Sequence, residues 1–100
     1  MLYAMAEPTR LGILRQLVRG ECCVCALGGE LEVEQSLLSH HLRTLRKSGL
    51  VQARREGRWA YYSLNPHALI TLRELLDNWI SATLAAEAST YCGNRAAGAL

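Results

Sequence analysis

The stretch from Glu30 to Leu50 constrains the fold of this 100-residue chain more than any other. Leu38, Leu42 and Leu45 recur at intervals of four and three residues, which predicts one apolar stripe on an α-helix over about 35–47. Gly49 follows the last turn, where a left-handed C-cap residue belongs. The opposite face carries polar and basic side chains: Gln35, Ser36, Ser39, His40, Arg43, Arg46 and Lys47. A helix that packs on one face and donates hydrogen bonds from the other suits a DNA major groove.

The charge of the chain is distributed unevenly, although the net charge is only +2. The segment 36–58 holds six Lys or Arg residues and one Glu, whereas the segment 20–34 holds four Glu and no Lys or Arg. A basic patch that coincides with a candidate recognition helix is an electrostatic footprint for phosphate. We therefore predict double-stranded DNA as a partner.

The elements before this helix are predicted from apolar spacing and from Gly and Pro. A short apolar start precedes a helix opened by Pro8. We expect that helix to end at Gly20, with Leu11, Leu14, Leu17 and Val18 on its packed face and Arg10, Arg15 and Arg19 outside. Val24, Leu27 and Leu31 then predict a short helix that Gly28 and Gly29 weaken by about 1 kcal/mol each.

The segment after Gly49 has the pattern of a β-hairpin over about 51–64. Glu56-Gly57 is its expected turn, and Arg54, Arg55 and Arg58 surround that turn. A hairpin directly after a recognition helix is the layout of a winged helix-turn-helix. We predict that the helix residues Gln35, Ser36, Ser39, His40 and Arg43 face the major groove. Arg54, Arg55 and Arg58 are predicted to contact phosphates or the minor groove.

A long last helix is predicted over about 66–89, opened by Asn65-Pro66 and carrying a wide apolar stripe. We expect it to pair with its twin in a homodimer, helped by the N-terminal residues; the alternative is that it folds back over its own core. A small Gly/Ala-rich tail over 90–100 is expected to be mobile. The sequence thus predicts a mainly α fold with a small β-hairpin wing (α+β), a single domain over 1–100. No apolar run approaches the ~20 residues of a membrane span, and we expect a cytoplasmic protein.

Three of the four cysteines lie within four residues, Cys22, Cys23 and Cys25, while Cys92 is distant. In a reducing compartment such a cluster favours soft-metal binding or redox chemistry over structural disulfides. Residues two apart on a helix point about 200° away from each other, so Cys23 and Cys25 could not share a ligand there. Either ligand binding distorts the helix start, or Cys22 and Cys23 lie in an extended segment before it. His41 neighbours the apolar stripe, and we expect it to be a structural hydrogen-bonding residue.

The segment from Glu21 to Pro66, with its Cys-Val-Cys motif and Ser-His-His-Leu in the following helix, resembles the core of ArsR–SmtB transcriptional repressors. The resemblance implies a homodimeric winged helix-turn-helix that releases its operator on binding a metal ion or metalloid, and it implies no enzyme activity. It also implies that Cys23 and Cys25 are ligands. The third cysteine of the arsenic-type members is replaced here by Gly28, which leaves Cys22 or Cys92 as the third ligand.

The function expected from this resemblance is a repressor released by As(III) or Sb(III), with Cd(II), Pb(II) or Zn(II) as other thiophilic effectors. Zinc sensing through the last helix is not expected, because that helix lacks the histidine ligands beyond His67. The alternative is a thiol-based sensor of oxidants or reactive sulfur with the same fold, in which Cys92 would pair with the 22–25 cluster. The sequence leaves open the effector ion, the third ligand and the operator.

Overall fold

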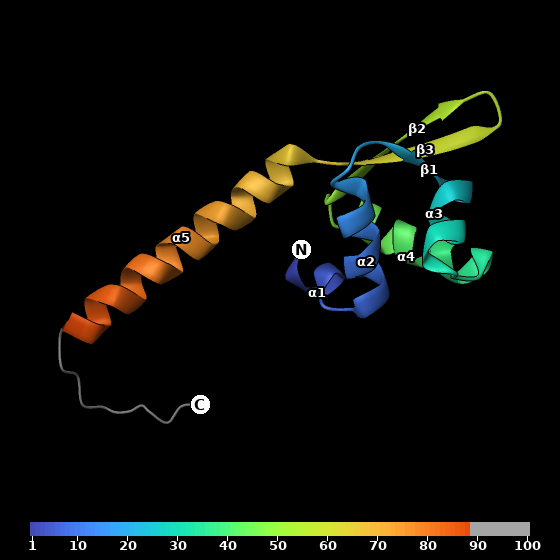
Figure 1. The fold of residues 1–100 in the computed structure, drawn as a ribbon. Helices are drawn as coiled ribbons and strands as arrows, with labels where there is room; N and C mark the ends of the chain where they lie inside the picture. The colour runs from blue at the N-terminus through green and yellow to red at the C-terminus, as the bar shows by residue number, and fades with distance from the viewer. Residues whose placement is uncertain (89–100) are drawn as a thin grey trace. The chain divides into compact units, whose positions relative to one another are not determined.

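The computed structural model describes residues 1–88, so the predicted tail and Cys92 lie outside the described residues. Its elements follow the order α1, α2, β1, α3, α4, β2, β3, α5 (Figure 1). They form two compact units, residues 1–69 and the segment from Ile70 onward. The prediction of a mainly helical chain with a small β-hairpin is confirmed. The bounds are α1 Leu2–Met5, α2 Pro8–Leu17, β1 Cys22–Cys23, α3 Val24–Leu31, α4 Gln35–Lys47, β2 Val51–Glu56, β3 Trp59–Leu64 and α5 Pro66–Ala88.

Helix α4 has the bounds that the sequence predicts. Leu38, Leu42 and Leu45 are at most 2% exposed, so the predicted apolar stripe lies in the core. The helix ends in a Schellman motif: the Leu50 N–H donates to the Leu45 carbonyl, and the Gly49 N–H donates to that of Arg46. Gly49 has a φ of 87°, which explains the glycine at this position.

The β2–β3 hairpin is antiparallel, and its register pairs Val51 with Leu64 and Glu56 with Trp59. The two-residue turn is therefore Gly57-Arg58, one residue later than the sequence suggests, because Glu56 still pairs within the ladder. Gly57 takes the positive φ of 63° that such a turn requires. A third strand, β1, pairs with β3 and gives the sheet order β1-β3-β2. Two residues are too short for an alternating pattern, so the sequence did not predict β1.

The packed face of α2 differs from the prediction. Arg10 is 6% exposed and lies on the same face as Ile13, Leu14 and Leu17, whereas Leu11 and Val18 are exposed. The apolar stripe is therefore rotated, and the placement of Arg10 outside was wrong. The physical reason is that Arg10 finds hydrogen-bond partners on two other helices, which offset the desolvation of its guanidinium.

Helix α5 begins where Asn65 interrupts the sheet. The Asn65 side chain donates to the Gly49 carbonyl and accepts from the His67 N–H, so it caps the helix and ties its start to the end of α4. Further along α5, large apolar side chains are exposed in the single chain: Leu76, Trp79, Ile80 and Leu84, at 47–60%. No helix within residues 1–88 combines the length and the hydrophobicity needed to cross a lipid bilayer.

Candidate DNA-binding surface and thiol site

The predicted DNA-contacting residues of α4 lie on the helix face away from the core. Gln35, Ser36, His40 and Arg43 are exposed, and Ser39 is half-buried. The Ser36 hydroxyl donates to Glu34 at 2.6 Å, which holds it at the helix start. The Thr44 hydroxyl donates to the backbone carbonyl of His40, and this hydrogen bond does not involve the His40 imidazole ring. The arrangement presents one continuous polar face.

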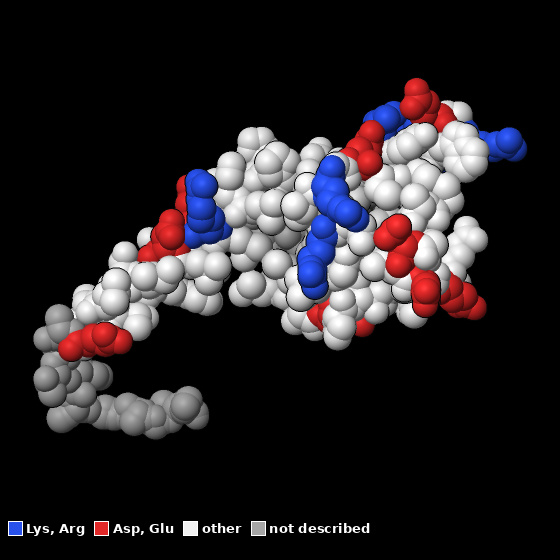
Figure 2. All heavy atoms as spheres, viewed as in Figure 1, with Lys and Arg blue, Asp and Glu red and all other residues white. Residues whose placement is uncertain are grey.

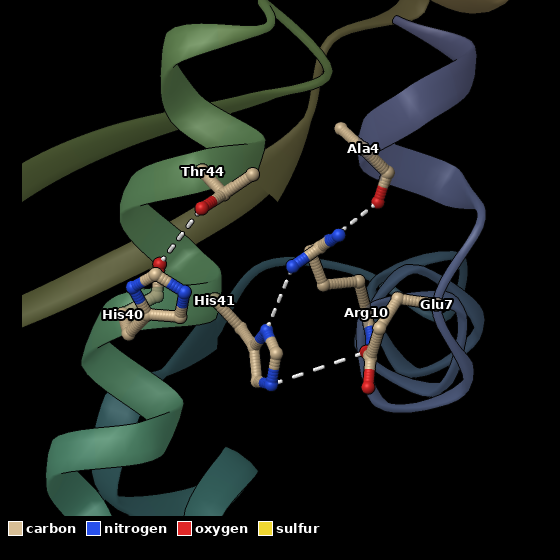
Figure 3. Close-up of polar contacts among 6 residues, drawn as sticks. All are labelled: Ala4, Glu7, Arg10, His40, His41 and Thr44. Atoms are coloured by element: carbon tan, nitrogen blue, oxygen red, sulfur yellow. Dashed lines mark hydrogen bonds and ion pairs between the residues drawn. The ribbon is translucent and has the colours of Figure 1, made fainter.

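The two neighbouring histidines of α4 have different environments (Figure 3). His40 is exposed, while His41 is 6% exposed and accepts a 3.1 Å hydrogen bond at Nδ1 from Arg10 Nη1. Nε2 of His41 lies 3.9 Å from Oε1 of Glu7. Arg10 also donates from Nε to the Ala4 carbonyl at 2.7 Å. These contacts connect α1, α2 and α4, which confirms the structural role predicted for His41 and fixes α4 on the core.

The carboxylate of Glu7 caps α2. Its Oε1 accepts from the Arg10 backbone N–H at 2.8 Å, so the Arg10 main chain and side chain both belong to this network. The hydrogen bond from the Arg10 N–H holds the pKa of Glu7 below its usual value.

The three arginines of the wing, meaning the β2–β3 hairpin, have unequal surroundings. Arg54 makes two hydrogen bonds to Glu21, at 2.7 and 2.8 Å, and one to Glu56 at 3.1 Å. Arg58 lies 5.7 Å from the centre of the Trp59 ring, and within residues 1–88 Arg55 and Arg58 form no ion pair. Acidic and basic atoms both lie on the hairpin in Figure 2. Arg55 and Arg58 are therefore the wing cations available to phosphate, and Arg54 is already engaged.

The thiol cluster straddles a strand and a helix. Cys22 and Cys23 form β1, and Cys25 is the second residue of α3. Of the two arrangements that the sequence left open, the extended one is present. Successive strand residues point to opposite faces, so Cys22 and Cys23 diverge, whereas the Cys23 and Cys25 thiols share a hydrogen bond.

Of the three predicted sulfur ligands within residues 1–88, Cys23 and Cys25 are thus the two in contact. Among residues 1–88, no three His, Cys, Asp or Glu side chains are close enough together to hold a metal ion. The donor set nevertheless suits a thiophilic atom, because two adjacent thiols at a helix start can bind it before a third ligand arrives.

The protonation of the paired thiols is asymmetric. The hydrogen bond from Cys25 lowers the pKa of the Cys23 thiol, and the Ala26 backbone N–H at the α3 N-terminus acts in the same direction. The same hydrogen bond raises the pKa of Cys25, since its proton is the one shared. Burial raises the pKa of Cys22. Of the two paired thiols, Cys23 is therefore the one whose thiolate this arrangement favours.

Cys25 opens into a groove of about 610 Å³ between α3, α4 and the wing. The groove residues come from all three elements: Val24, Cys25, Gly28, Gly29, Val33, Gln35, Leu38, Ser39, Arg55, Arg58, Trp59, Ala60 and Tyr62. Four of the predicted DNA-contacting residues, Gln35, Ser39, Arg55 and Arg58, line it together with a thiol. The spacing of these residues along the chain does not predict this proximity, because it depends on how the wing packs beside α3.

A helix with an exposed polar face, followed by a hairpin in which Arg55 and Arg58 form no ion pair within residues 1–88, is the arrangement of a winged helix-turn-helix DNA-binding regulator. Comparison with known proteins identifies the group. Residues 7–53 match the family model described as bacterial regulatory protein, arsR family. The chain belongs to this family, whose members are DNA-binding transcriptional regulators and not enzymes.

The relatives include metal and arsenic regulators. The transcriptional repressor SmtB homolog of Synechocystis is 45% identical over 75% of this chain and 58% of the relative. The arsenical resistance operon repressor of Escherichia coli is 42% identical over 73% of this chain and 63% of the relative. The chain therefore spans less than two thirds of the length of both.

Solved structures confirm the winged-helix fold. A crystal structure described as a possible transcriptional regulator for arsenical resistance is 41% identical, covers 78% of this chain and 81% of that chain, and has a TM-score of 0.71. Reduced HlyU from Vibrio cholerae is also 41% identical over 78% of this chain and 82% of that chain, with a TM-score of 0.66.

Proposed function

We propose that this regulator is a repressor that binds operator DNA and is released when As(III), Sb(III) or another thiophilic ion binds Cys23 and Cys25. The observation that carries this proposal is the hydrogen-bonded pair formed by these two thiols, which opens at Cys25 into the groove shared with Gln35, Ser39, Arg55 and Arg58. Relatives named as arsenical resistance repressors support the choice of effector.

The proposed DNA interface combines the polar face of α4 with the wing. Gln35, Ser36, Ser39, His40 and Arg43 would contact the major groove, and Arg55 and Arg58 would contact phosphate or the minor groove. Two observations support this assignment: the α4 residues are exposed or half-buried, and among the described residues 1–88 Arg55 and Arg58 form no ion pair. Arg54 is the weakest member of the predicted set, because a phosphate would have to displace two carboxylates.

The effector chemistry follows from the thiols. Each As–S bond forms as a thiol of the protein loses its proton and a hydroxyl of As(OH)₃ leaves, so one water is released for each bond. Cys23 would attack first and Cys25 second, in the order of their pKa shifts. Cys22 or Cys92 would supply the third sulfur; Cys22 must rotate from the opposite face of β1 to do so. Cd(II), Pb(II) and Zn(II) would use the same thiolates.

Release of the operator DNA would result from two effects of effector binding at the thiol cluster. Gathering a third sulfur must distort β1 or the start of α3, and an atom bound at Cys25 enters the groove that Gln35, Ser39 and the wing arginines line. A coupling factor of about 5- to 150-fold in DNA affinity is typical of such linkage, and DNA must weaken effector binding by the same factor.

The proposed assembly is a cytoplasmic homodimer of single winged helix-turn-helix domains over 1–100. The exposed Leu76, Trp79, Ile80 and Leu84 on α5 and the exposed Leu2 support an interface through the last and N-terminal helices. A two-fold dimer would read two half-sites about 34–36 Å apart, or a multiple of this spacing. Sedimentation showing a monomer at micromolar concentration would contradict this assembly.

The function is tested with a duplex selected from a random pool by the reduced wild-type protein. Sodium arsenite should release the wild type, while Cys23→Ser and Cys25→Ser should bind the duplex normally and resist release. Arg15→Gln, a change at an exposed arginine of α2, is the matched control and should respond as the wild type does. Normal release of both cysteine variants would contradict the thiol site, and no selected duplex would contradict the DNA-binding role.

A second candidate is a repressor that senses oxidants or reactive sulfur. The lowered pKa of the Cys23 thiol favours it, and one relative of known structure is described as reduced HlyU. Mass spectrometry separates the two functions. For an arsenic-responsive repressor, arsenite should add the mass of arsenic to the wild type, and no disulfide should form. For a sensor of reactive sulfur, a persulfide should add sulfur or produce an internal disulfide, and the protein should then release DNA without arsenite.

A further inference from the structure

Three residues form a row across the sheet beside the thiol pair. Cys23 on β1 pairs with Tyr61 on β3, and Tyr61 pairs with Arg54 on β2. Residues directly opposite in neighbouring strands point to the same face of a sheet, so Cys23, Tyr61 and Arg54 are lateral neighbours. The guanidinium of Arg54 lies over the Tyr61 ring, 4.7 Å from its centre.

The Arg54 side chain also contacts Glu21, in the segment that carries the thiols. Its Nε and Nη2 atoms donate to the two carboxylate oxygens of Glu21, at 2.7 and 2.8 Å, and Glu21 is two residues before Cys23. Its Nη1 atom donates to Glu56, the last residue of β2, at 3.1 Å. The bidentate contact holds the pKa of the Glu21 carboxyl below its usual value.

Exposed ion pairs in general contribute little to the free energy of unfolding. The Glu21–Arg54 pair differs from most of them, because it is bidentate, a second carboxylate contacts the same guanidinium, and an aromatic ring lies beneath that guanidinium. The contact spans 33 residues of sequence and adds to the two pairings that hold β1 on the sheet. The contact therefore connects Glu21 to the wing.

We propose that Arg54 is a positioning residue that couples the thiol site to the wing through Glu21, and is not a DNA contact. Gathering sulfur atoms around an effector displaces the backbone at Cys22 and Cys23, which displaces Glu21. Arg54 passes this displacement to β2, and thus to Arg55 in the next position and to Arg58 in the turn. The proposal rests on the proposed function, since it concerns how effector binding reaches the DNA interface.

The test uses Glu21→Gln and Arg54→Gln in the full chain, with Glu32→Gln and Arg15→Gln as controls at exposed residues outside this contact. Operator affinity, its salt dependence and the arsenite-induced release are measured on the selected duplex. Glu21→Gln and Arg54→Gln should both bind the duplex within about twofold of the wild type and with the same salt slope. Both should bind arsenite with the wild-type stoichiometry. The release factor is the ratio of operator affinity without arsenite to operator affinity with arsenite. It should fall at least about threefold in both variants and stay at the wild-type value in the controls.

A charge-exchanged double variant, Glu21→Arg with Arg54→Glu, should restore part of the release that each single change removes. A role confined to stability would lower the melting temperature of the single variants without changing the release factor, and this result would overturn the proposal. A salt slope reduced by about one in Arg54→Gln, together with tighter DNA binding in Glu21→Gln, would show that Arg54 contacts phosphate and would also overturn it.

The wild-type measurement separates this proposal from the function on which it rests. If arsenite does not release the wild type, the proposed function fails and the coupling through Arg54 fails with it. If arsenite releases the wild type and the two variants equally, only the coupling is overturned.

Discussion

Helix α4 and the β1–α3 segment lie side by side in the DNA-binding unit, yet they are held in opposite ways. Helix α4 buries three leucines and His41, and it is anchored to α2 and α1 through Arg10. In the β1–α3 segment, β1 has two residues, only Leu27 of α3 is fully buried, and Gly28 and Gly29 lie within the helix, where each lowers its stability. The proposed recognition helix is therefore held by more buried side chains and hydrogen bonds than the proposed sensing segment.

This difference suits a regulator in which small displacements decide the outcome. A recognition helix has to present its side chains at a fixed angle, whereas a thiol site that gathers ligands has to change shape. The two segments meet at the groove beside Cys25, and the Glu21–Arg54 contact adds a second connection through the wing. Experiments that soften α4 or stiffen α3 test whether the difference matters.

The largest effect is expected where the anchoring of α4 is removed. Arg10→Met keeps an apolar stem but leaves Nδ1 of His41 and the Ala4 carbonyl without their donors. We expect a loss of about 2–4 kcal/mol in the free energy of unfolding. Arg15→Met on the exposed side of α2 should stay within about 0.5 kcal/mol of the wild type. Urea unfolding measures both, and equal midpoints would show that the buried network does not stabilise α4.

The two histidines of α4 should separate DNA affinity from stability. His40→Ala should leave the unfolding midpoint unchanged and weaken binding to the selected duplex by about 1–3 kcal/mol if the ring contacts a base. His41→Ala should instead lower the unfolding midpoint, since it removes the acceptor of Arg10. Fluorescence anisotropy and urea unfolding of both variants check this. If His40→Ala binds as well as the wild type, His40 does not belong to the interface.

The paired thiols should differ in reactivity by at least about threefold. At a pH below both pKa values, Cys23 has the larger thiolate fraction, so iodoacetamide should alkylate it before Cys25. The difference should shrink as the pH rises and both thiols ionise. In urea, where the hydrogen bond between the thiols is lost, the two rates should be equal. Peptide mass spectrometry gives the rates, and faster alkylation of Cys25 in the folded protein would reverse the proposed order of attack.

The sequence was sufficient where the signal was local. The 3.6-residue period of the leucines and the glycine after the last turn gave the bounds of α4, and the Asn65-Pro66 pair gave the start of α5. The sequence did not reveal hydrogen bonds between residues that lie far apart along the chain. Arg10 is buried because His41, 31 residues away, accepts its hydrogen bond. A charge near a turn predicts a DNA contact for Arg54, and it does not reveal that Glu21 lies opposite it.

The candidate site was predicted in part for the same reason. The proximity of Cys22, Cys23 and Cys25 in sequence identified a thiol cluster, but β1 is what turns Cys22 away from Cys23 and leaves Cys23 with Cys25. One available signal was missed: Arg10, Ile13, Leu14 and Leu17 have i, i+3, i+4 and i+7 spacing, which places the arginine on the buried face.

The smallest effect is expected from stiffening α3 at a single position. A Cβ added at Gly29 meets nothing within 4 Å, so Gly29→Ala should raise the free energy of unfolding by about 0.5–1 kcal/mol through helix propensity. Gly28→Ala is the matched comparison, because its Cβ would lie 3.4 Å from Leu38 Cδ2 and so recover less. If α3 must deform when sulfur atoms gather, Gly29→Ala should need more arsenite for half-release of the duplex. Added stability with an unchanged arsenite midpoint would show that the deformation is confined to β1.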